Sequence, residues 1–338
     1  MNENCLSRKT SQCLKGILCM CILIHHLYQF TGLFVNTYFG HFLSLLGQWA
    51  VTVFTFISGF GLYSSYASKN KEYLDGFLKK RVLPIYLTYV VFVIIYLIYD
   101  FRSVTDWKQI LRSLTVGGTI FSFGWYFQLI YVLYLGFFII FRFCRFPKLR
   151  SGLMLIFLIG YVALSIVFKQ DPVRYIPLAS FALGLITAVH NKRIYKVLNR
   201  LWPLFLITSF ATFFSVYIIY IRAIISGLIN LPDTVMTVLI TVSHLAVVIF
   251  VVTLSLIFTR KSIPVIENPV TQKLGEFSLE IYAFQGLFLR LFIKYISNTA
   301  LYILTSVASI LLVAFIFHTL KQLLQKKLNR SNTPGTKS

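Results

Sequence analysis

Acidic residues are scarce in this sequence. Its 338 residues contain ten Asp and Glu against 32 Lys and Arg, and charged residues of both signs make up only 12% of the chain. An ordinary soluble domain is about 25% charged. Too few polar side chains are therefore present to cover a surface that faces water, and the composition excludes a soluble globular protein.

Several signatures of common chemistry are also missing. The sequence has no phosphate-binding glycine loop, no serine nucleophile elbow and no metal-ligand spacing, so nucleotide hydrolysis and metal catalysis have no positive signal. None of the cysteines falls in a segment expected on the outer face, which argues against a disulfide framework. These five cysteines are Cys5, Cys13, Cys19, Cys21 and Cys144.

Long apolar runs fill most of the chain. Hydrophobic residues make up 57% of it, and its mean hydropathy is +0.77. A transmembrane helix needs about 20 predominantly apolar residues, and continuously apolar runs favour helices over the alternating strands of a β-barrel. The sequence predicts an all-α polytopic integral membrane protein with about ten transmembrane helices. The predicted spans are 16–35, 42–64, 82–99, 121–141, 152–168, 174–190, 202–221, 236–258, 274–293 and 300–318.

The basic residues lie unevenly on the two sides of these spans. Alternate connections place 24 Lys and Arg residues on one side and eight on the other. Because cytoplasmic loops are enriched in Lys and Arg, both termini are predicted to be cytoplasmic. Basic residues confined to short loops also argue against nucleic-acid binding. We expect a cytoplasmic segment at 1–15, a transmembrane domain at 16–318 whose first span is retained, and a basic cytoplasmic tail at 319–338, in the cell membrane.

Histidines in the first span are the leading candidates for chemistry, because ionisable residues are costly in a membrane. Lys15 and His26 are eleven residues apart, roughly 16 Å along the helix and close to three turns, so they share a face. A cation at the cytoplasmic mouth and an imidazole further in suit an anionic donor that docks from the cytoplasm, since imidazole accepts a hydroxyl proton near neutral pH. Alternatively, His25 and His26 pack against other helices through hydrogen bonds.

Two carboxylates occur in the ninth span. Glu276 and Glu280 are predicted to share one helix face by their spacing of four. They pair with Lys15 or Arg81 to neutralise a basic cluster, or Glu280 takes part in the chemistry. His244, which lies near no motif, is predicted to link helices.

The second span and the loop after it add further candidates. Ser58 lies in the run 54–60 with a glycine beside it, which is typical of close helix packing. Lys79, Lys80 and Arg81 are clustered where the third span begins. Such a cluster binds phosphates or simply orients the protein in the membrane.

A pattern of short segments runs in order along most of the chain. Its parts are Lys15 followed after ten residues by His26, residues 54–60 with 77–86, Trp125 to Phe127, and Gly275 with Ser278 and Tyr282. In this pattern the chain resembles the acyltransferase-3 family of bacterial integral membrane O-acyltransferases, which have about ten spans. It departs from the family at four positions. Lys15 replaces the usual arginine, which keeps the charge but loses the bidentate fork, and Thr52, Pro84 and Gln285 are also atypical.

The resemblance implies transfer of an acyl group, usually acetyl, from acyl-CoA in the cytoplasm to a hydroxyl of a cell-surface polysaccharide or its lipid-linked glycan precursor. It implies acetyl-CoA as a donor substrate, no bound cofactor and no metal, with membrane lipid as the surroundings. His26 would be the base or an acyl relay. Lys15, Lys80 and Arg81 would hold the anionic end of the donor. The remaining site candidates are Glu280, His25, Ser58, Trp125 and Tyr282.

Two other functions stay open at this point. A polysaccharide polymerase or flippase also has ten or more spans and basic loops, but the chain lacks a large external loop. A proton-coupled transporter would use His and Glu in its spans, and an inverted repeat would favour it. The two halves of the sequence show no such similarity.

Overall fold

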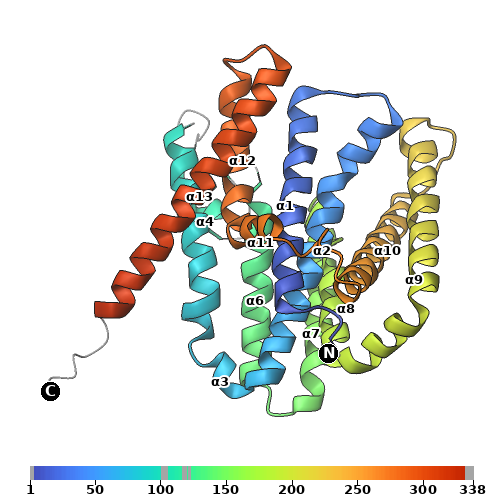
Figure 1. Cartoon of the computed structure of the whole chain (residues 1–338), viewed down its shortest axis with the longest axis vertical. Coiled ribbons are helices and arrows are strands. Elements are labelled where there is room, and N and C mark those ends of the chain that lie inside the picture. The colour runs from blue at the N-terminus through green and yellow to red at the C-terminus, as the bar shows by residue number, and fades with distance from the viewer. Residues whose placement is uncertain (1–3, 100–105, 116–119, 121–122, 332–338) are drawn as a thin grey trace.

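Helices make up almost all of the structure. The computed structural model describes residues 4–99, 106–115, 120 and 123–331, and this part of the chain is 84% helical with no strand. Nine of the described helical segments are long and apolar enough to cross a membrane. The chain is thus an all-α polytopic membrane protein, as predicted (Figure 1). The α-helices are α1 (Arg8–Thr31), α2 (Tyr38–Lys69), α3 (Lys71–Leu74), α4 (Leu83–Tyr99), α5 (Trp107–Leu114), α6 (Trp125–Phe143), α7 (Pro147–Val167), α8 (Leu178–Val189), α9 (Asn191–Tyr220), α10 (Asp233–Arg260), α11 (Pro269–Glu276), α12 (Ser278–Ile293) and α13 (Thr299–Ser331).

Three short segments extend this list. A π-helix, η1 (Leu78–Val82), leads into α4, a 3-10 helix, η3 (Pro172–Arg174), precedes α8, and a second π-helix, η4 (Ile221–Ile225), follows α9. Pro84 helps to explain η1, because a proline lacks the N–H that would bond to the carbonyl four residues earlier.

The predicted ninth span differs from the others. In place of one helix over 274–293, the structure has α11 and then α12, with Phe277 between them at φ −116° and ψ 24°. Asn268 caps α11 through a capping box, and Pro269 follows at the first helical position, so the sequence sets a separate start for this helix. The prediction that Glu276 and Glu280 share one continuous helix face is therefore wrong. With 16 residues, α12 is too short to count among the nine apolar helices above.

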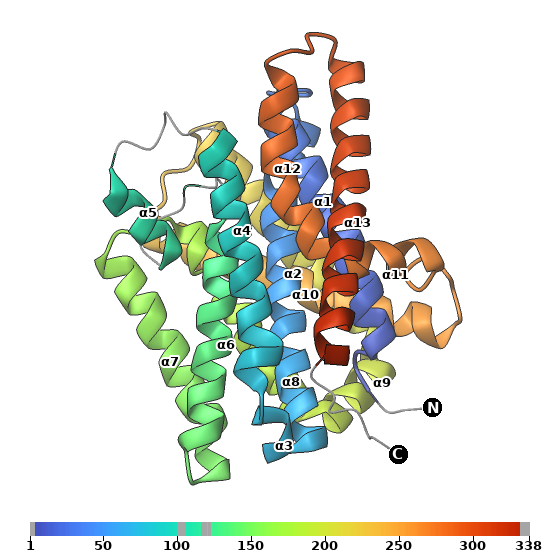
Figure 2. The same ribbon diagram turned by 90° about the vertical axis from the view of Figure 1, so that its left-hand side faces the viewer.

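The C-terminal helix is longer than expected. We predicted that the last span ends at residue 318 and that a solvated tail follows, but α13 continues to Ser331. Figure 2 shows α12 and α13 side by side. The polar residue Lys321 lies within this extension and contacts α4 and α12, as described below.

Two pairs of helices approach so closely that only glycine fits between them. A Cβ on Gly59 of α2 would lie 2.3 Å from the backbone oxygen of Phe181, and one on Gly184 of α8 would lie 2.2 Å from that of Phe56. Gly16 of α1 and Gly275 of α11 meet in the same way, with Thr271 O and Gln12 O at 2.1 and 1.9 Å. Small residues at such contacts are typical of helix packing in membranes. The close packing predicted beside Ser58 is confirmed.

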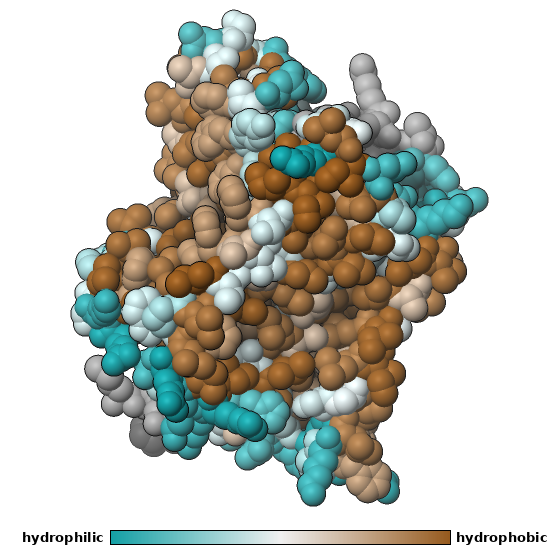
Figure 3. All heavy atoms as spheres, turned by 90° about the vertical axis from the view of Figure 1, so that its right-hand side faces the viewer, coloured by the Kyte–Doolittle hydropathy of each residue, from teal (hydrophilic) through white to brown (hydrophobic). Residues whose placement is uncertain are grey.

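The outer surface is apolar over the middle of the molecule. Figure 3 shows one side, where brown apolar residues cover the central region and hydrophilic residues gather toward the two ends. Around the molecule, exposed apolar side chains lie on α7, α9 and α13: Ile156, Ile159, Leu204, Ile207, Phe210, Leu304 and Leu312. They suit contact with lipid chains.

Two ends of the bundle can be named from these helices. The N-terminus, α3 and the turn between α8 and α9 lie toward one end (Figure 1), which we call the N-terminal face. At this face the backbone N–H of Cys5 donates to Asn191 Oδ1 at 2.9 Å. We call the opposite end the distal face, where α1 ends and α2 begins. That the N-terminal face is cytoplasmic stays a prediction from the charge distribution.

Candidate active site

A cavity of about 430 Å³ brings several of the sequence candidates together. His25 and His26 come from α1, Trp125 from α6 and Tyr282 from α12. Its other lining residues are Ile22, Gln29, Gly47, Gln48, Val51, Phe123, Asp171, Val173 and Arg174. Residues far apart in the sequence thus meet around the two histidines.

The position of the cavity along α1 follows from helix geometry. His26 lies five residues before the end of α1 at Thr31, about 8 Å along the axis, and roughly 16 Å beyond Lys15. Asp171 and Arg174 belong to the connection between α7 and α8, on the side opposite the N-terminal face. The imidazole is therefore closer to the distal end of α1 than to Lys15.

His26 is held in a defined orientation. It is 7% exposed, its Nδ1 lies 2.8 Å from Oε1 of Gln29, and its ring stacks on Phe123 with centroids 3.7 Å apart. An amide oxygen only accepts, so Nδ1 carries the proton in this pairing. The lone pair of the neutral ring is then on Nε2, which makes no hydrogen bond within the described residues. This nitrogen is free to take a proton or an acyl group.

His25 has a different environment, although it lines the same cavity. Its Nδ1 donates to the carbonyl oxygen of Leu43 on α2 at 2.9 Å. Its ring also packs on Gly47, where an added Cβ would lie 2.4 Å from His25 Cδ2. His25 therefore joins α1 to α2 and stands beside His26 with ring centroids 5.0 Å apart. For His25, the structure thus agrees with the alternative prediction that this histidine packs against another helix through a hydrogen bond.

Tyr282 supports the stacked ring. Its hydroxyl donates to the backbone oxygen of Phe123 at 2.7 Å, and Phe123 is the residue that stacks on His26. Trp125 follows two residues later and presents its indole to the cavity. Tyr282 and Trp125 thus both belong to the wall around His26.

Aromatic side chains pack behind the cavity. The rings of Tyr282 on α12 and Tyr126 on α6 lie 5.6 Å apart, and the Tyr126 ring lies 6.3 Å from that of Phe54 on α2. Ser58 donates to the backbone oxygen of Phe54 at 3.0 Å. Ser58 does not line the cavity.

The predicted cations are partly brought together. Lys15 is half-buried in α1, and the charges of Arg81 and Arg8 act on its ammonium group. Lys80 is exposed on η1, and no described contact joins it to Lys15. Lys15 therefore lies within electrostatic range of Arg81 and Arg8, and Lys80 neighbours Arg81 on η1.

A neutral phenol lies beside Arg81. The guanidinium of Arg81 is 6.0 Å from the ring centre of Tyr73. Burial raises the pKa of Tyr73, and the charge of Arg81 opposes this shift only in part. The phenol stays protonated near neutral pH, so it is able to donate a hydrogen bond to an anion.

Comparison with known protein families identifies the family of this chain. A family model described as an acyltransferase domain matches residues 10–319, nearly the whole chain. The chain belongs to the acyltransferase-3 family. It is therefore an acyltransferase, and the resemblance seen in the sequence is confirmed. No curated protein and no solved structure matches the chain.

Glu280 of this acyltransferase lies away from the histidine cavity. Its carboxylate is 2% exposed, with Lys321 Nζ at 3.0 Å and His318 Nδ1 at 3.4 Å. Lys321 also donates to the hydroxyl of Thr88 at 3.1 Å. The predicted pairing of Glu280 with Lys15 or Arg81 is wrong. The helix is interrupted at Phe277, and the cation that pairs with Glu280 is Lys321 of the extended α13. Glu280 ties α4, α12 and α13 together, and its role in catalysis stays a prediction.

The other predicted residues have partners that explain them. Glu276 pairs with Lys273 at 2.8 Å. His244 on α10 is 2.8 Å from the hydroxyl of Thr52 on α2. The prediction that His244 links helices is confirmed, and the unusual threonine at position 52 is its partner.

Sequence reasoning missed several lining residues of the cavity. Gln29 was detectable, because it stands three residues after His26 on the same helix face. Phe123 and Arg174 reach the cavity only through the fold. Asp171 had one available signal, since it is among the ten acidic residues of the chain.

Proposed function

We propose that this acyltransferase moves an acetyl group from acetyl-CoA at the cytoplasmic side to a hydroxyl of a cell-surface polysaccharide or its lipid-linked precursor, in the cell membrane. The observation that supports this most directly is that α1 carries a cation, Lys15, about two turns from its start and an oriented imidazole, His26, near its end. Membership of an acyltransferase family favours this activity over the polymerase, flippase and transporter alternatives.

The donor would bind at the N-terminal face. Phosphate groups of acyl-CoA suit Lys15, Arg81 and Arg8, because charge-assisted hydrogen bonds are the strong ones. Tyr73 adds a neutral donor, and Lys80 is close enough in sequence to join when the phosphates are bound. The thioester end would then extend along α1 toward His26.

The chemistry would centre on Nε2 of His26. As a base, Nε2 takes the proton of the acceptor hydroxyl while the oxygen attacks the thioester carbon. The C–S bond breaks, and the thiolate receives the proton as free CoA is released. As a relay, Nε2 itself attacks the thioester carbon, the C–S bond breaks and the CoA thiolate leaves. The acceptor hydroxyl then attacks the acyl carbon, the N–C bond breaks, and the hydroxyl proton ends on the CoA thiolate. In both routes Gln29 orients the ring through Nδ1.

The acceptor would enter from the distal side of the cavity. Trp125 offers an aromatic face, and Asp171 and Arg174 offer hydrogen-bonding groups of both kinds at this end. Ligand sites typically have a mostly apolar wall with a small number of polar groups that point toward the ligand. An aromatic ring together with a carboxylate and a guanidinium suits a ligand with many hydroxyls, such as a sugar.

The proposal is tested by proton NMR of surface polysaccharide from cells that carry wild type, His26→Ala or no copy of the chain. We expect acetyl signals with wild type and their loss with His26→Ala, with the amount and length of polymer unchanged. His41→Ala is the matched control, because His41 lies outside the cavity at the start of α2. Lost polymer would indicate a polymerase or flippase, and acetylation that persists without the chain would reject the proposal for that glycan.

A second experiment separates the two routes. Purified protein is mixed with isotopically labelled acetyl-CoA in the absence of acceptor, quenched and examined by peptide mass spectrometry. Label on the peptide that contains His26 supports the relay. Rapid transfer on addition of acceptor, without any labelled intermediate, supports the base.

A further inference from the structure

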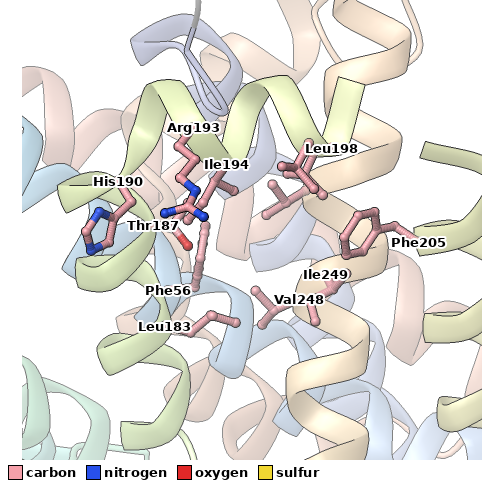
Figure 4. Close-up of a pocket in the computed structure, with 12 residues that line it drawn as sticks. Phe56, Leu183, Thr187, His190, Arg193, Ile194, Leu198, Phe205, Val248 and Ile249 are labelled. Carbon is pink, nitrogen blue, oxygen red and sulfur yellow. The ribbon is translucent and has the colours of Figure 1, made fainter. Parts of the chain in front are cut away.

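A second cavity, of about 410 Å³, lies between α2, α8, α9 and α10 and shares no lining residue with the histidine cavity. Figure 4 shows the residues that line it. The lining residues are Phe56, Leu183, Thr187, His190, Arg193, Ile194, Val197, Leu198, Phe205, Val248, Ile249 and Val252. His190 is the turn between α8 and α9, and Arg193 lies in the first turn of α9, so this end of the cavity is at the N-terminal face, and we call it the mouth.

A bend in α9 creates this space. Leu201 is non-helical at φ −111° and ψ 23°, two residues before Pro203. A proline inside a helix removes one backbone hydrogen bond and clashes with the carbonyl four residues before it. The first part of α9 therefore turns away from the second, as Figure 1 shows. Arg193 and Leu198 reach the cavity from the first part, and Phe205 reaches it from the second.

The walls and the mouth differ in chemistry. Val248, Val252 and Phe56 form an apolar floor, with exposed fractions of 0%, 4% and 2%. Arg193 points into the cavity above Thr187 (Figure 4). Arg193 makes no hydrogen bond or ion pair with any described residue. An apolar cavity with one cation, Arg193, above it suits an amphiphilic ligand. The apolar chain of such a ligand would enter the cavity, and its negatively charged head group would contact the cation.

The surroundings of the mouth are strongly basic. The first part of α9 and the end of α10 contribute five more cations here: Lys192, Lys196, Arg200, Arg260 and Lys261. One acidic residue, Glu267, lies near the end of α10: it accepts from the Thr259 hydroxyl at 3.2 Å and also contacts Lys9 and Thr10 on α1. Lys261 also lies 5.8 Å from the ring centre of Trp202, an aromatic residue of the kind that sits at membrane interfaces.

We propose that this cavity holds one acyl chain of an anionic phospholipid from the membrane leaflet at the N-terminal face, with the lipid phosphate on Arg193. The charge of the mouth selects the head group, since a basic cluster at the membrane surface attracts anionic lipid. The apolar floor takes the chain, because each buried methylene adds to binding. This site does not depend on the proposed acyl-transfer reaction.

The test measures lipid binding to purified protein by native mass spectrometry, with phosphatidylglycerol and phosphatidylethanolamine as probes. Removing a direct charge-assisted hydrogen bond to the phosphate should weaken binding of both lipids by about tenfold or more, because both carry that phosphate. We therefore expect Arg193→Gln to lose this factor for both lipids, while the other cations at the mouth still favour phosphatidylglycerol. Lys192→Gln is the matched control, because it removes a neighbouring cation that does not line the cavity, and its affinity for phosphatidylethanolamine should stay at the wild-type level.

A second variant tests the acyl-chain part. Ile249→Trp narrows the cavity and should reduce retention of both lipids, and its melting temperature shows whether it folds. Equal binding by the Arg193 and Lys192 variants would overturn the proposal. Recovery of a polyprenyl phosphate from the cavity, with no phospholipid, would overturn it as well.

Discussion

The contact between Gly47 and His25 makes the structure of the histidine cavity directly testable. Gly47→Ala would place a methyl group 2.4 Å from Cδ2 and 2.7 Å from Cγ of His25, and these ring atoms cannot retreat without moving the whole side chain. Overpacking of this kind costs about 1–3 kcal/mol. Displacing the ring also strains its hydrogen bond to Leu43, worth roughly 1 kcal/mol. The helix preference of alanine over glycine returns about 1 kcal/mol, so the net loss should be about 1–3 kcal/mol.

The assay is thermal unfolding of the purified protein in detergent, together with the initial rate of acyl transfer. Gly61→Ala is the control on the same helix, because a Cβ at Gly61 meets nothing within 4 Å. It should melt at or above the temperature of wild type. Gly47→Ala should melt lower and transfer more slowly. In the double variant with His25→Ala, the clash is absent, so the combined loss should be smaller than the sum of the single losses. Equal melting of the two glycine variants would refute this account of the cavity.

Three further predictions concern the donor site, the imidazole and the buried carboxylate. Lys15→Gln should raise KM for the acyl donor by about tenfold or more, whereas Lys15→Arg should keep it low; an unchanged KM in both would argue against donor binding there. Gln29→Leu should lower kcat by about tenfold with little change in KM, because His26 loses its orienting partner, and an unaltered kcat would contradict this role. Glu280→Gln and Lys321→Met should each lower the free energy of unfolding by about 2–3 kcal/mol, with a smaller loss together than the sum. Glu276→Gln, at an exposed ion pair, should cost at most about 1 kcal/mol, and similar melting of all these variants would contradict the structural role of Glu280.

Hydropathy alone was enough to predict the helical bundle, because a backbone in lipid must satisfy its own hydrogen bonds. The site candidates came from the histidines in the first span and from the family resemblance. His26, Trp125 and Tyr282 were selected from separate spans, and they meet in one cavity. Their meeting depends on helix depth and face, which the sequence reveals.

The partners of charged residues were harder to predict. Glu280 was expected near Lys15 because the ninth span looked like one continuous helix. Phe277 interrupts that helix, and the cation comes from Lys321, beyond the apolar run that defined the last span. A pattern of apolar residues does not predict where a helix is interrupted within a polar segment. It also does not predict which other helix packs against that segment. The stacking of Phe123 on His26 was also not predictable from the sequence, because it depends on how three helices pack together.

The placement of Lys15 and His26 on a single helix sets a limit on how this enzyme is able to move. An unbroken α-helix is a stiff rod, so the distance between the two side chains stays constant whenever α1 shifts. At Gly16 and Gly275, the backbone of the N-terminal half of α1 lies in direct contact with the backbone of α11. Opening and closing during turnover must therefore come from the elements around α1. If the proposed donor phosphates bind at Lys15, the fixed rise along α1 to His26 sets the length that the donor would have to span.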